Sequence, residues 1–460
     1  YNGIFRIPPG FYLALKKGKQ QLVRPKLVRY YSMPFSRHPI EDVDKKIIEY
    51  EEAWKSSIKD FLRSKGTKKL GSMLSGGLDT SYVVWAASQV YKKSVKTYTC
   101  YYDNPLFDEI NQARYVAKRC NAANTGIKVD EKDLDLLPEM IYAAGEPVLA
   151  SSLSIFKLMK LASQEVDTIF TGDGGNNIYH HLYPVSEIHR CLKDVPLFVR
   201  KAIYALVSGS ASMTGNERLW ELKHALYPFR YRLYDDFYLH LVCYRHFSED
   251  ERKKLFLPMF PQSISETALA ANMKISKASF DDDLISARFV HGNMEYVSTF
   301  HERFARYLGM SVFTPYQSRE VMEFIDSLPR DFLYKGNTIQ KLTNKAYKMN
   351  FHKLALKKHF PSDFIDRTGK PFDQPFHTWL AARPDVTSAL LSSLKRRGWY
   401  DAAYLETMFA EHRRQYQSDR IFCQLSNHSY RIMALLSLEI WCRLFIDKIE
   451  WKGMGLADVL

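Results

Sequence analysis

One stretch of the sequence combines small, hydroxyl and acidic residues in an order that suits phosphate chemistry. Residues 74–81 read Leu-Ser-Gly-Gly-Leu-Asp-Thr-Ser and join a short apolar run to a longer run of small and apolar residues. The first run predicts a buried strand and the second a helix. At such a junction, unpaired backbone N–H groups and the positive end of the helix dipole favour a bound phosphate. The expected nucleotide contacts are Leu74, Ser75, Gly76, Gly77, Asp79, Thr80 and Ser81.

Asp79 is an acid in a stretch otherwise suited to anions, so a cation is expected beside it. Mg²⁺ that bridges this carboxylate to phosphate oxygens is the natural candidate. The two glycines are expected to accept positive φ and to let the backbone approach the ligand closely. An ordinary strand–helix turn, capped by Asp79 or Thr80, is the alternative interpretation. A Walker A loop is excluded because no Gly-Lys-Ser/Thr follows.

A second glycine-rich turn, residues 172–177, reads Gly-Asp-Gly-Gly-Asn-Asn and follows an apolar run at 166–171. In a parallel sheet, ligands bind at the carboxyl ends of the strands, so both turns are expected to face one crevice. We predict that Gly172, Gly174 and Gly175 permit close backbone approach to a polyanion.

The elements around these turns predict an α/β fold with a doubly wound parallel sheet, because strand-like and helix-like runs alternate over residues 42–171. From about residue 185 to the end, aromatic and basic helical patterns replace the strand-like runs and predict a large α-helical half. The acidic run at 281–283 is interpreted as a helix start. The expected strands cover residues 69–74, 96–102, 124–129 and 166–171, and the expected helices cover 42–62, 107–120, 134–144 and 152–164.

The first turn resembles the Ser-Gly-Gly-x-Asp-Ser signature of ATP pyrophosphatases, with Thr80 in place of the final Ser. The second resembles the Ser-Gly-Glu-Gly-x-Asp-Glu turn of asparagine synthetases, and the likeness to the synthetase domain of that family covers roughly residues 1–380. It implies a carbon–nitrogen ligase that forms an acyl-adenylate from ATP, releases pyrophosphate and then admits an amine. Further matching segments are Asp108-Glu109…Ala113-Arg114, Glu146-Pro147, Pro315-Tyr316, Leu328-Pro329, Lys335-Gly336…Ala346 and Arg367…Trp379-Leu380.

The resemblance also assigns roles within the two turns. Asp173 falls where the family has an acid at the reaction centre, and we predict that it takes the proton of the attacking amine. Asn176 falls where the family has a Mg²⁺-binding Asp, so Asp79 and Asn176 are the predicted metal ligands, although an amide brings no charge. Lys341 and Lys335 are the candidates for a cation that steadies the oxyanion, because β-lactam synthetases carry a lysine in the corresponding helix.

Two departures from the family pattern bear on the substrate. Ser311 and Ser318 stand where asparagine synthetases carry Glu and Asp, so a pocket for free aspartate is not expected. The Gly-Asp-Gly-Gly-Asn form of the second turn is closer to the lasso-peptide cyclase branch, whose members close a macrolactam. We therefore expect macrolactam closure of a peptide, with a precursor peptide and an associated protease as partners. Amidation of a small carboxylate, a tRNA- or nucleotide-modifying ATP pyrophosphatase and a non-catalytic partner protein are the alternatives.

The first residues resemble the last hairpin of a glutaminase domain, with a Pro-Pro-Gly turn at 8–10 and a polar tip at 16–20. Residues 1–35 are therefore expected to be a glutaminase-like hairpin and linker, and residues 36–460 the ATP-pyrophosphatase domain. Within that domain, 36–185 would bind the nucleotide and 186–460 would be mostly helical. No N-terminal catalytic cysteine is present, so no glutaminase activity is expected of this chain.

Composition limits the partners and the compartment. The excess of 65 Lys and Arg over 51 Asp and Glu gives a net charge of +14, which favours an acidic partner such as ATP or an anionic peptide. Nucleic acid is a further candidate, but the basic residues are scattered, which is typical of a solvated surface. The resemblance disfavours a nucleic-acid substrate, because tRNA-modifying enzymes lack the Pro-Phe region that Pro315-Tyr316 matches. Six dispersed cysteines predict free thiols in a reducing cytoplasm, and no apolar run predicts a membrane span. The aromatic and basic residues expected to suit an extended peptide are Tyr227, Phe229, Arg230, Tyr231, Arg232, Tyr234, Phe237 and Tyr238.

Overall fold

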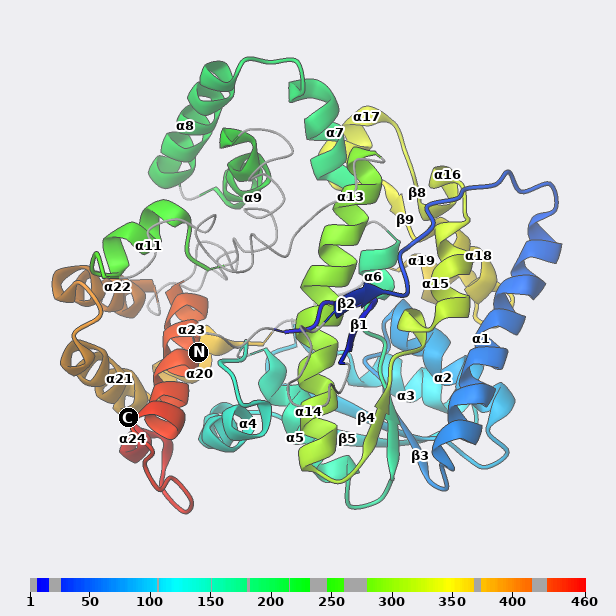
Figure 1. Ribbon diagram of the computed structural model, residues 1–460, viewed down its shortest axis with the longest axis horizontal. Helices are drawn as coiled ribbons and strands as arrows, with labels where there is room; N and C mark the ends of the chain where they lie inside the picture. Colours follow the sequence, from blue (N-terminus) through cyan, green and yellow to red (C-terminus); the bar gives the residue numbers. More distant parts are fainter. Residues whose placement is uncertain are drawn as a thin grey trace.

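The computed structural model contains a five-stranded parallel sheet, which lies in the lower right part of the view in Figure 1. All four pairings between neighbouring strands are parallel, so the predicted α/β fold with a doubly wound sheet is confirmed. The strand order is β5 (Ala123–Lys128), β4 (Lys96–Tyr101), β3 (Leu70–Met73), β6 (Thr168–Phe170) and β7 (Ser311–Phe313). The structure describes residues 6–15, 26–105, 107–149, 151–179, 183–214, 216–231, 246–259, 279–367, 374–415 and 428–460.

The edge strand β7 comes from the part of the chain expected to be helical. Ser311 pairs with Thr168, and Phe313 pairs with Phe170. Three residues are too few to show the alternation that identifies a strand, and β7 forms only because β6 offers it a partner. The division of the domain at residues 185 and 186 stays a prediction, but the central sheet draws one strand from beyond it.

Small residues in the central strand β3 let its neighbours approach. A Cβ atom on Gly71 would lie 3.0 Å from a methyl of Val166 and 3.1 Å from the ring of Tyr98. All four residues of β3 are buried, as expected for a strand covered on both faces.

One face of the sheet is covered by a cluster that includes Trp54, Val83, Phe170 and Phe351. The helix α1 alone contributes four fully or nearly fully buried side chains on one stripe, as its helical spacing predicted. The elements on this side are α1 (Val43–Lys65), α2 (Leu78–Val90), α3 (Ile110–Arg119), η5 (Pro315–Gln317), α15 (Arg319–Asp326), α16 (Arg330–Leu333), β8 (Tyr334–Lys335), α17 (Thr338–Leu342), β9 (Tyr347–Lys348), α18 (Asn350–Lys357) and α19 (Ser362–Asp366).

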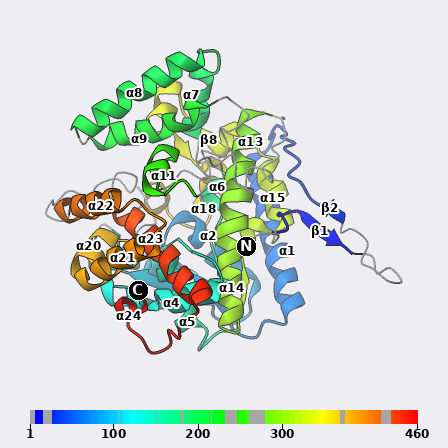
Figure 2. The ribbon, with the colours of Figure 1, turned by 60° about the vertical axis from the view of Figure 1, so that its left-hand side comes forward.

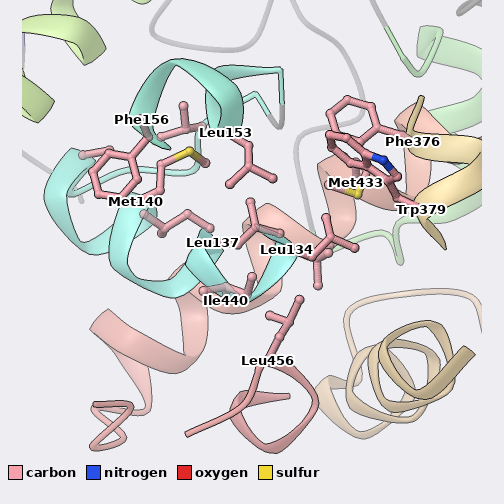
Figure 3. Close-up of a cluster of buried hydrophobic side chains, with 14 of the residues drawn as sticks. Leu134, Leu137, Met140, Leu153, Phe156, Phe376, Trp379, Met433, Ile440 and Leu456 are labelled. Carbon is pink, nitrogen blue, oxygen red and sulfur yellow. The ribbon is translucent and has the colours of Figure 1, made fainter. Parts of the chain in front are cut away.

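The opposite face carries a second cluster, in which Leu137 and Phe156 meet residues from the end of the chain such as Trp379 and Ile440 (Figure 3). The C-terminal helices therefore share one hydrophobic core with the helices on this face of the sheet. The elements here are η1 (Glu131–Leu136), α4 (Leu137–Ala144), α5 (Ser152–Ala162), α11 (Glu249–Leu255), α14 (Thr299–Tyr307), α20 (Phe376–Ala382), α21 (Pro384–Arg397), α22 (Ala402–Gln415), α23 (His428–Trp441), η6 (Cys442–Ile446) and α24 (Leu456–Val459).

A third, smaller cluster holds a helical group that stands beside the sheet layers (Figure 2). The acidic run starts the helix α13 (Phe280–Ser286) of this group, where the Ser279 side chain accepts from the N–H of Asp282, so the predicted helix start is confirmed. Between this group and the sheet lie the short helix α6 (Gly175–Ile178) and the π-helix η4 (Ala287–Ser298). The group comprises α7 (Tyr183–Leu192), α8 (Leu197–Thr214), α9 (Glu217–Leu226), η2 (Tyr227–Arg230) and α13 (Phe280–Ser286).

The expected N-terminal hairpin is present as β1 (Phe11–Ala14) paired antiparallel with β2 (Lys26–Arg29). Its tip and residues 1–5 lie outside the described residues, and its origin in a glutaminase-like domain stays a prediction. The following linker docks through Arg37, which pairs with Asp282 at 2.6 Å. No helix in the described ranges has the length and apolarity that a bilayer crossing requires.

Candidate active site

The first glycine-rich turn leaves a helix N-terminus open. Helix α2 begins at Leu78 with Gly77 as its N-cap, and no side chain caps it. Asp79 and Thr80 lie inside the helix, which excludes the ordinary capped turn. The backbone N–H groups in the first helical turn of α2 therefore have no side-chain cap and are suited to a phosphate.

The hydroxyl groups of this turn brace the turn itself. Thr80 Oγ1 accepts from the N–H of Ser75 at 3.1 Å, and Ser81 Oγ donates to the carbonyl of Gly77 at 2.6 Å. Leu74 is buried, and its N–H donates to Tyr98 while its carbonyl accepts from Thr99. Leu74, Ser75, Thr80 and Ser81 thus position the loop, and direct contacts between these residues and a nucleotide stay a prediction.

The two glycines of the turn have different roles. Gly76 has φ of +82°, and a Cβ there would lie 2.7 Å from both the N of Ala113 and the Cβ of Gln112. Its close approach is therefore to the start of α3. Gly77 would meet only Ser75 Oγ at 3.2 Å, so the space in front of it is available to a ligand.

The second turn packs directly against the first. A Cβ on Gly172 would lie 2.8 Å from Thr80 Cγ2, and one on Gly175 would lie 2.5 Å from Asp79 Oδ1. Gly174 has φ of +93°, which favours glycine there. Both turns follow the carboxyl ends of their strands, as predicted, but they are in direct contact where the sequence predicted a crevice between them. Gly172 and Gly175 make room for the other turn, and their close approach to a polyanion stays a prediction.

Asp79 and Asn176 lie together at this junction. Asn176 Nδ2 donates to Asp79 Oδ2 at 3.1 Å, and Asp79 Oδ1 is enclosed without a hydrogen-bond partner in the described part of the chain. Burial raises the pKa of Asp79 to about 7, and the negative charge of Asp173 adds to this. A cation would relieve both effects, so these residues fit Mg²⁺.

The same geometry limits what kind of metal site this is. The described residues contain no group of three or more His, Cys, Asp or Glu side chains that could enclose an ion. Mg²⁺ here would take its remaining ligands from water and substrate phosphates, which is its usual coordination in phosphoryl chemistry.

Asp173 is held as a carboxylate by a residue that sequence reasoning missed. His301, in α14, lies with Nδ1 2.7 Å from Asp173 Oδ2. Burial alone would raise the pKa of Asp173, but the charge and hydrogen bond of His301 outweigh it and lower the pKa. The His301 side chain is 4% exposed and that of Asp173 is 23% exposed, so Asp173 is the solvent-facing partner. An isolated histidine in a helix carries no signal in the sequence.

Arg367 is a second residue that the site adds. Its guanidinium donates to the carbonyl of Gly76 and lies 3.5 Å from Glu109 Oε1. Because Gly76 precedes the open helix end, Arg367 fixes the turn from outside the sheet. The family pattern had included Arg367, but without a role.

The two candidate lysines are placed elsewhere. Lys341 lies 3.6 Å from Glu187 and 5.5 Å from the ring centre of Tyr334, while Lys335 is exposed in β8. In the described structure, no hydrogen bond or ion pair joins either lysine to Asp79 or Asp173.

The serines expected to form the substrate pocket occupy different ends of β7. Ser311 pairs with Thr168 at the amino end of the sheet, away from the two turns. Ser318 follows the carboxyl end, where its hydroxyl donates to the carbonyl of Pro315 at 2.8 Å. Only Ser318 is placed to affect a ligand at the turns.

The aromatic and basic cluster at 227–238 is partly core. Tyr227 and Phe229 are fully buried, and Arg230 pairs with Asp250 at 2.8 Å. Residues 232–238 lie outside the described residues. The described members therefore do not form the expected peptide surface.

A chain of buried hydrogen bonds reaches the first glycine-rich turn at the carbonyls of Leu78 and Asp79. Tyr179 donates to Tyr50, which lies 3.1 Å from His352 Nδ1. His352 Nε2 lies 3.2 Å from the hydroxyl of Tyr316 and 3.4 Å from the carbonyl of Leu78. Because a carbonyl only accepts, Nε2 carries the proton and Nδ1 accepts from Tyr50. Tyr316 in turn donates to the carbonyl of Asp79 at 3.4 Å.

This geometry agrees with what the chain is similar to. Residues 49–443 match the family model described as asparagine synthase. The chain belongs to the asparagine synthase family. It is 26% identical over 200 residues to "Asparagine synthetase [glutamine-hydrolyzing] 1" of Bacillus subtilis (strain 168), a match that covers 40% of this chain and 31% of that relative. The match thus spans less than a third of the relative's length.

Proposed function

We propose that this member of the asparagine synthase family is an ATP-dependent carbon–nitrogen ligase that forms an amide through an acyl-adenylate. The observation that carries the proposal is the direct junction of the two turns. It brings an uncapped helix N-terminus, the Asp79–Asn176 pair and the Asp173–His301 pair to one edge of the sheet.

In the first half-reaction, a carboxylate oxygen of the substrate attacks the α-phosphorus of ATP. The bond from that phosphorus to the bridging oxygen breaks, and pyrophosphate leaves with the bonding electrons. The N–H groups at the start of α2 face developing negative charge of this kind, which preorganised donors stabilise. Asp79 and Asn176 would hold Mg²⁺, which supplies charge neutralisation for the phosphates.

In the second half-reaction, an amine attacks the acyl carbon, AMP leaves, and the nitrogen loses a proton. Because His301 lowers the pKa of Asp173, this carboxylate stays ionised at neutral pH. An ionised Asp173 would bind the amine N–H and stabilise the positive charge that develops on nitrogen. Asp173 is a weaker proton acceptor than an ordinary aspartate. We therefore propose that its main role is to orient the amine and stabilise the charge on nitrogen, and that proton removal is secondary. The proposal gives no role to either candidate lysine. Lys341 pairs with Glu187, and Lys335 is exposed in β8.

For the acyl substrate we propose a peptide side chain that is closed to a macrolactam by the peptide's own amine. Support comes from the Gly-Gly form of the second turn and from Ser318, an uncharged residue whose hydroxyl is used within its own turn. Two features expected to favour a peptide substrate do not support it. Ser311 lies at the amino end of the sheet, away from the turns, and Tyr227 is buried. Amidation of a small carboxylate is the second candidate, favoured by the name of the Bacillus relative.

The test uses the full chain with ATP and MgCl₂ in parallel arms. One arm contains peptides with a free N-terminus and an internal Asp or Glu, a second contains free aspartate with ammonium, and a third contains tRNA. We expect AMP and pyrophosphate in the peptide arm, with a product lighter than the linear peptide by one water. Turnover only with aspartate would refute the macrolactam proposal and keep the ligase. AMP release that requires added tRNA would favour a tRNA-modifying enzyme, and no AMP in any arm would favour a non-catalytic partner.

A further inference from the structure

A cavity of about 660 Å³ lies at the edge of the sheet opposite the two turns. Its walls come from the end of α2, the residues before β4, the end of α3 and the residues that follow α18. These elements pack beside one another (Figure 1). Since β3 to β6 are parallel, the cavity faces their amino ends while the turns follow their carboxyl ends. The cavity is therefore separate from the candidate active site.

The lining of this cavity is basic and contains no Asp or Glu. Within the described ranges, three of its cations lack a carboxylate partner. Lys92 has no partner, Lys93 reaches only the carbonyl of Lys68 at 3.5 Å, and Arg119 donates to the carbonyl of His359. Lys358 adds a fourth cation, paired only with the exposed Asp44.

The floor of the cavity is fixed by aromatic contacts. The rings of Trp85 and His359 stack with centres 3.9 Å apart, and Glu51 holds His359 from behind at 2.7 Å. The guanidinium of Arg119 lies 5.7 Å from the ring centre of Phe360. Arg119 is thus oriented before any ligand arrives, which lowers the entropic cost of binding.

Cations often follow helix C-termini because the dipole favours them. This effect accounts for Arg119 and Lys118 in the last turn of α3. Lys92 and Lys93 follow the end of α2, and Lys358 is the C-cap of α18, so the dipole favours these cations as well. It does not account for the convergence of three helix ends on one cavity, which Lys118 does not line. A cavity of several hundred Å³ lined by convergent like charges has the size and polarity of a site for a multiply charged small molecule.

We propose that this cavity binds a small ligand that carries two or more phosphate groups, either a nucleotide or an inorganic polyphosphate. Arg119 and the lysines contact the phosphates, and the Trp85–His359 stack borders the remainder of the ligand. The site is independent of the proposed ligase reaction.

Lysine footprinting on the full chain tests this site. Because each lysine is followed separately, phosphate binding at the first glycine-rich turn does not interfere. The protein is briefly acetylated with and without inorganic triphosphate, ATP or adenosine, and each lysine is followed by mass spectrometry. We expect triphosphate to slow the labelling of Lys92 and Lys93 about fivefold when most sites are filled, with Lys118 unchanged. Stronger protection by ATP would identify a nucleotide as the ligand, and equal protection would identify the phosphates alone.

Charge reversal supplies the matched comparison. In the double variant Lys92→Glu, Lys93→Glu, calorimetric titration with triphosphate should lose one binding event, whereas Lys118→Glu should retain it. A circular dichroism spectrum and thermal unfolding confirm that each variant is folded. If misfolding affects the double variant, Lys93→Gln alone should still weaken binding. Equal labelling of Lys92, Lys93 and Lys118 at every triphosphate concentration would overturn the proposal.

Discussion

His301 Nδ1 lies 2.7 Å from Asp173 Oδ2, with the histidine buried behind the carboxylate. The two residues are far apart in sequence, since Asp173 follows β6 and His301 belongs to α14. The pair fixes the charge of the only acid in the second turn. The consequences of this arrangement can be measured separately for the two half-reactions.

The first prediction concerns His301→Leu. Without the imidazole, the pKa of Asp173 should rise, because burial then acts without the compensating charge. We expect amide formation to slow about 10- to 100-fold, with a smaller effect on ATP–pyrophosphate exchange. The acidic limb of the pH–rate profile should move to higher pH. His301→Asn, which keeps a donor near Nδ1, should recover part of the rate; an unchanged acidic limb in His301→Leu would contradict the pairing.

The second prediction concerns Asp79→Ala. Removing the enclosed carboxylate should abolish pyrophosphate release while the fold is retained, because the charged oxygen that suits Mg²⁺ is lost. Asp79→Asn is the matched control for shape, and it should be equally inactive yet more stable than Asp79→Ala. ATP-dependent release of pyrophosphate by either variant at the original rate would remove Asp79 from the metal site.

The third prediction concerns Asn176→Asp. Two carboxylates would then replace the 3.1 Å hydrogen bond between Asn176 and Asp79. Without Mg²⁺ the variant should unfold at a lower temperature than the original protein, because like charges at this distance repel. With Mg²⁺ and ATP the difference should shrink or reverse, and less Mg²⁺ should suffice for half-maximal rate. Thermal unfolding that responds identically to Mg²⁺ in both proteins would show that residue 176 does not bind the metal.

The fourth prediction compares two glycines. Gly175→Ala places a methyl 2.5 Å from Asp79 Oδ1 and should cost about 1–3 kcal/mol of stability. Gly77→Ala meets only the flexible Ser75 hydroxyl at 3.2 Å, and its φ of −69° suits alanine. We therefore expect Gly77→Ala to fold normally but to raise the KM for ATP. If Gly77→Ala leaves the KM for ATP unchanged, the space before Gly77 is not where ATP binds.

The fifth prediction concerns acid stability and His352. Burial lowers the pKa of this histidine to about 3, whereas an unfolded chain protonates histidine near its ordinary value of 6.5. The unfolded state therefore binds more protons below pH 6.5, so stability falls as pH falls from about 6.5 towards 3. His352 contributes up to about 1.4 kcal/mol per pH unit to this slope.

Urea unfolding between pH 7 and pH 5 measures that contribution. His352→Gln should reduce the slope of the unfolding free energy against pH by close to the value that corresponds to one bound proton. Tyr179→Phe removes a hydrogen bond of the same chain and serves as the control, because its pKa is raised and it does not titrate in this range. It should lower stability at every pH and leave the slope unchanged. The same slope in His352→Gln and the original protein would exclude a buried, neutral His352.

Some features of this protein are determined locally, and the sequence alone was sufficient to predict them. The turn at 74–81 needs only its glycines and the apolar runs beside it, so its strand and its helix were predicted correctly. Residues 175–177 of the second turn instead begin the short helix α6. Parallel strands follow from the alternation with helices, which forces a crossover for each strand.

Other features depend on segments distant in sequence. The strand β7 exists because β6 pairs with it, and His301 reaches Asp173 because α14 packs on the sheet. Likewise, a Cβ at Gly172 or Gly175 would meet the other turn, a contact that the neighbouring residues in the sequence do not reveal. Such contacts bring together residues whose individual positions carry no periodic or motif signal. The sequence therefore determined where the two glycine-rich turns lie, and the tertiary structure decided which side chains set the charge around them.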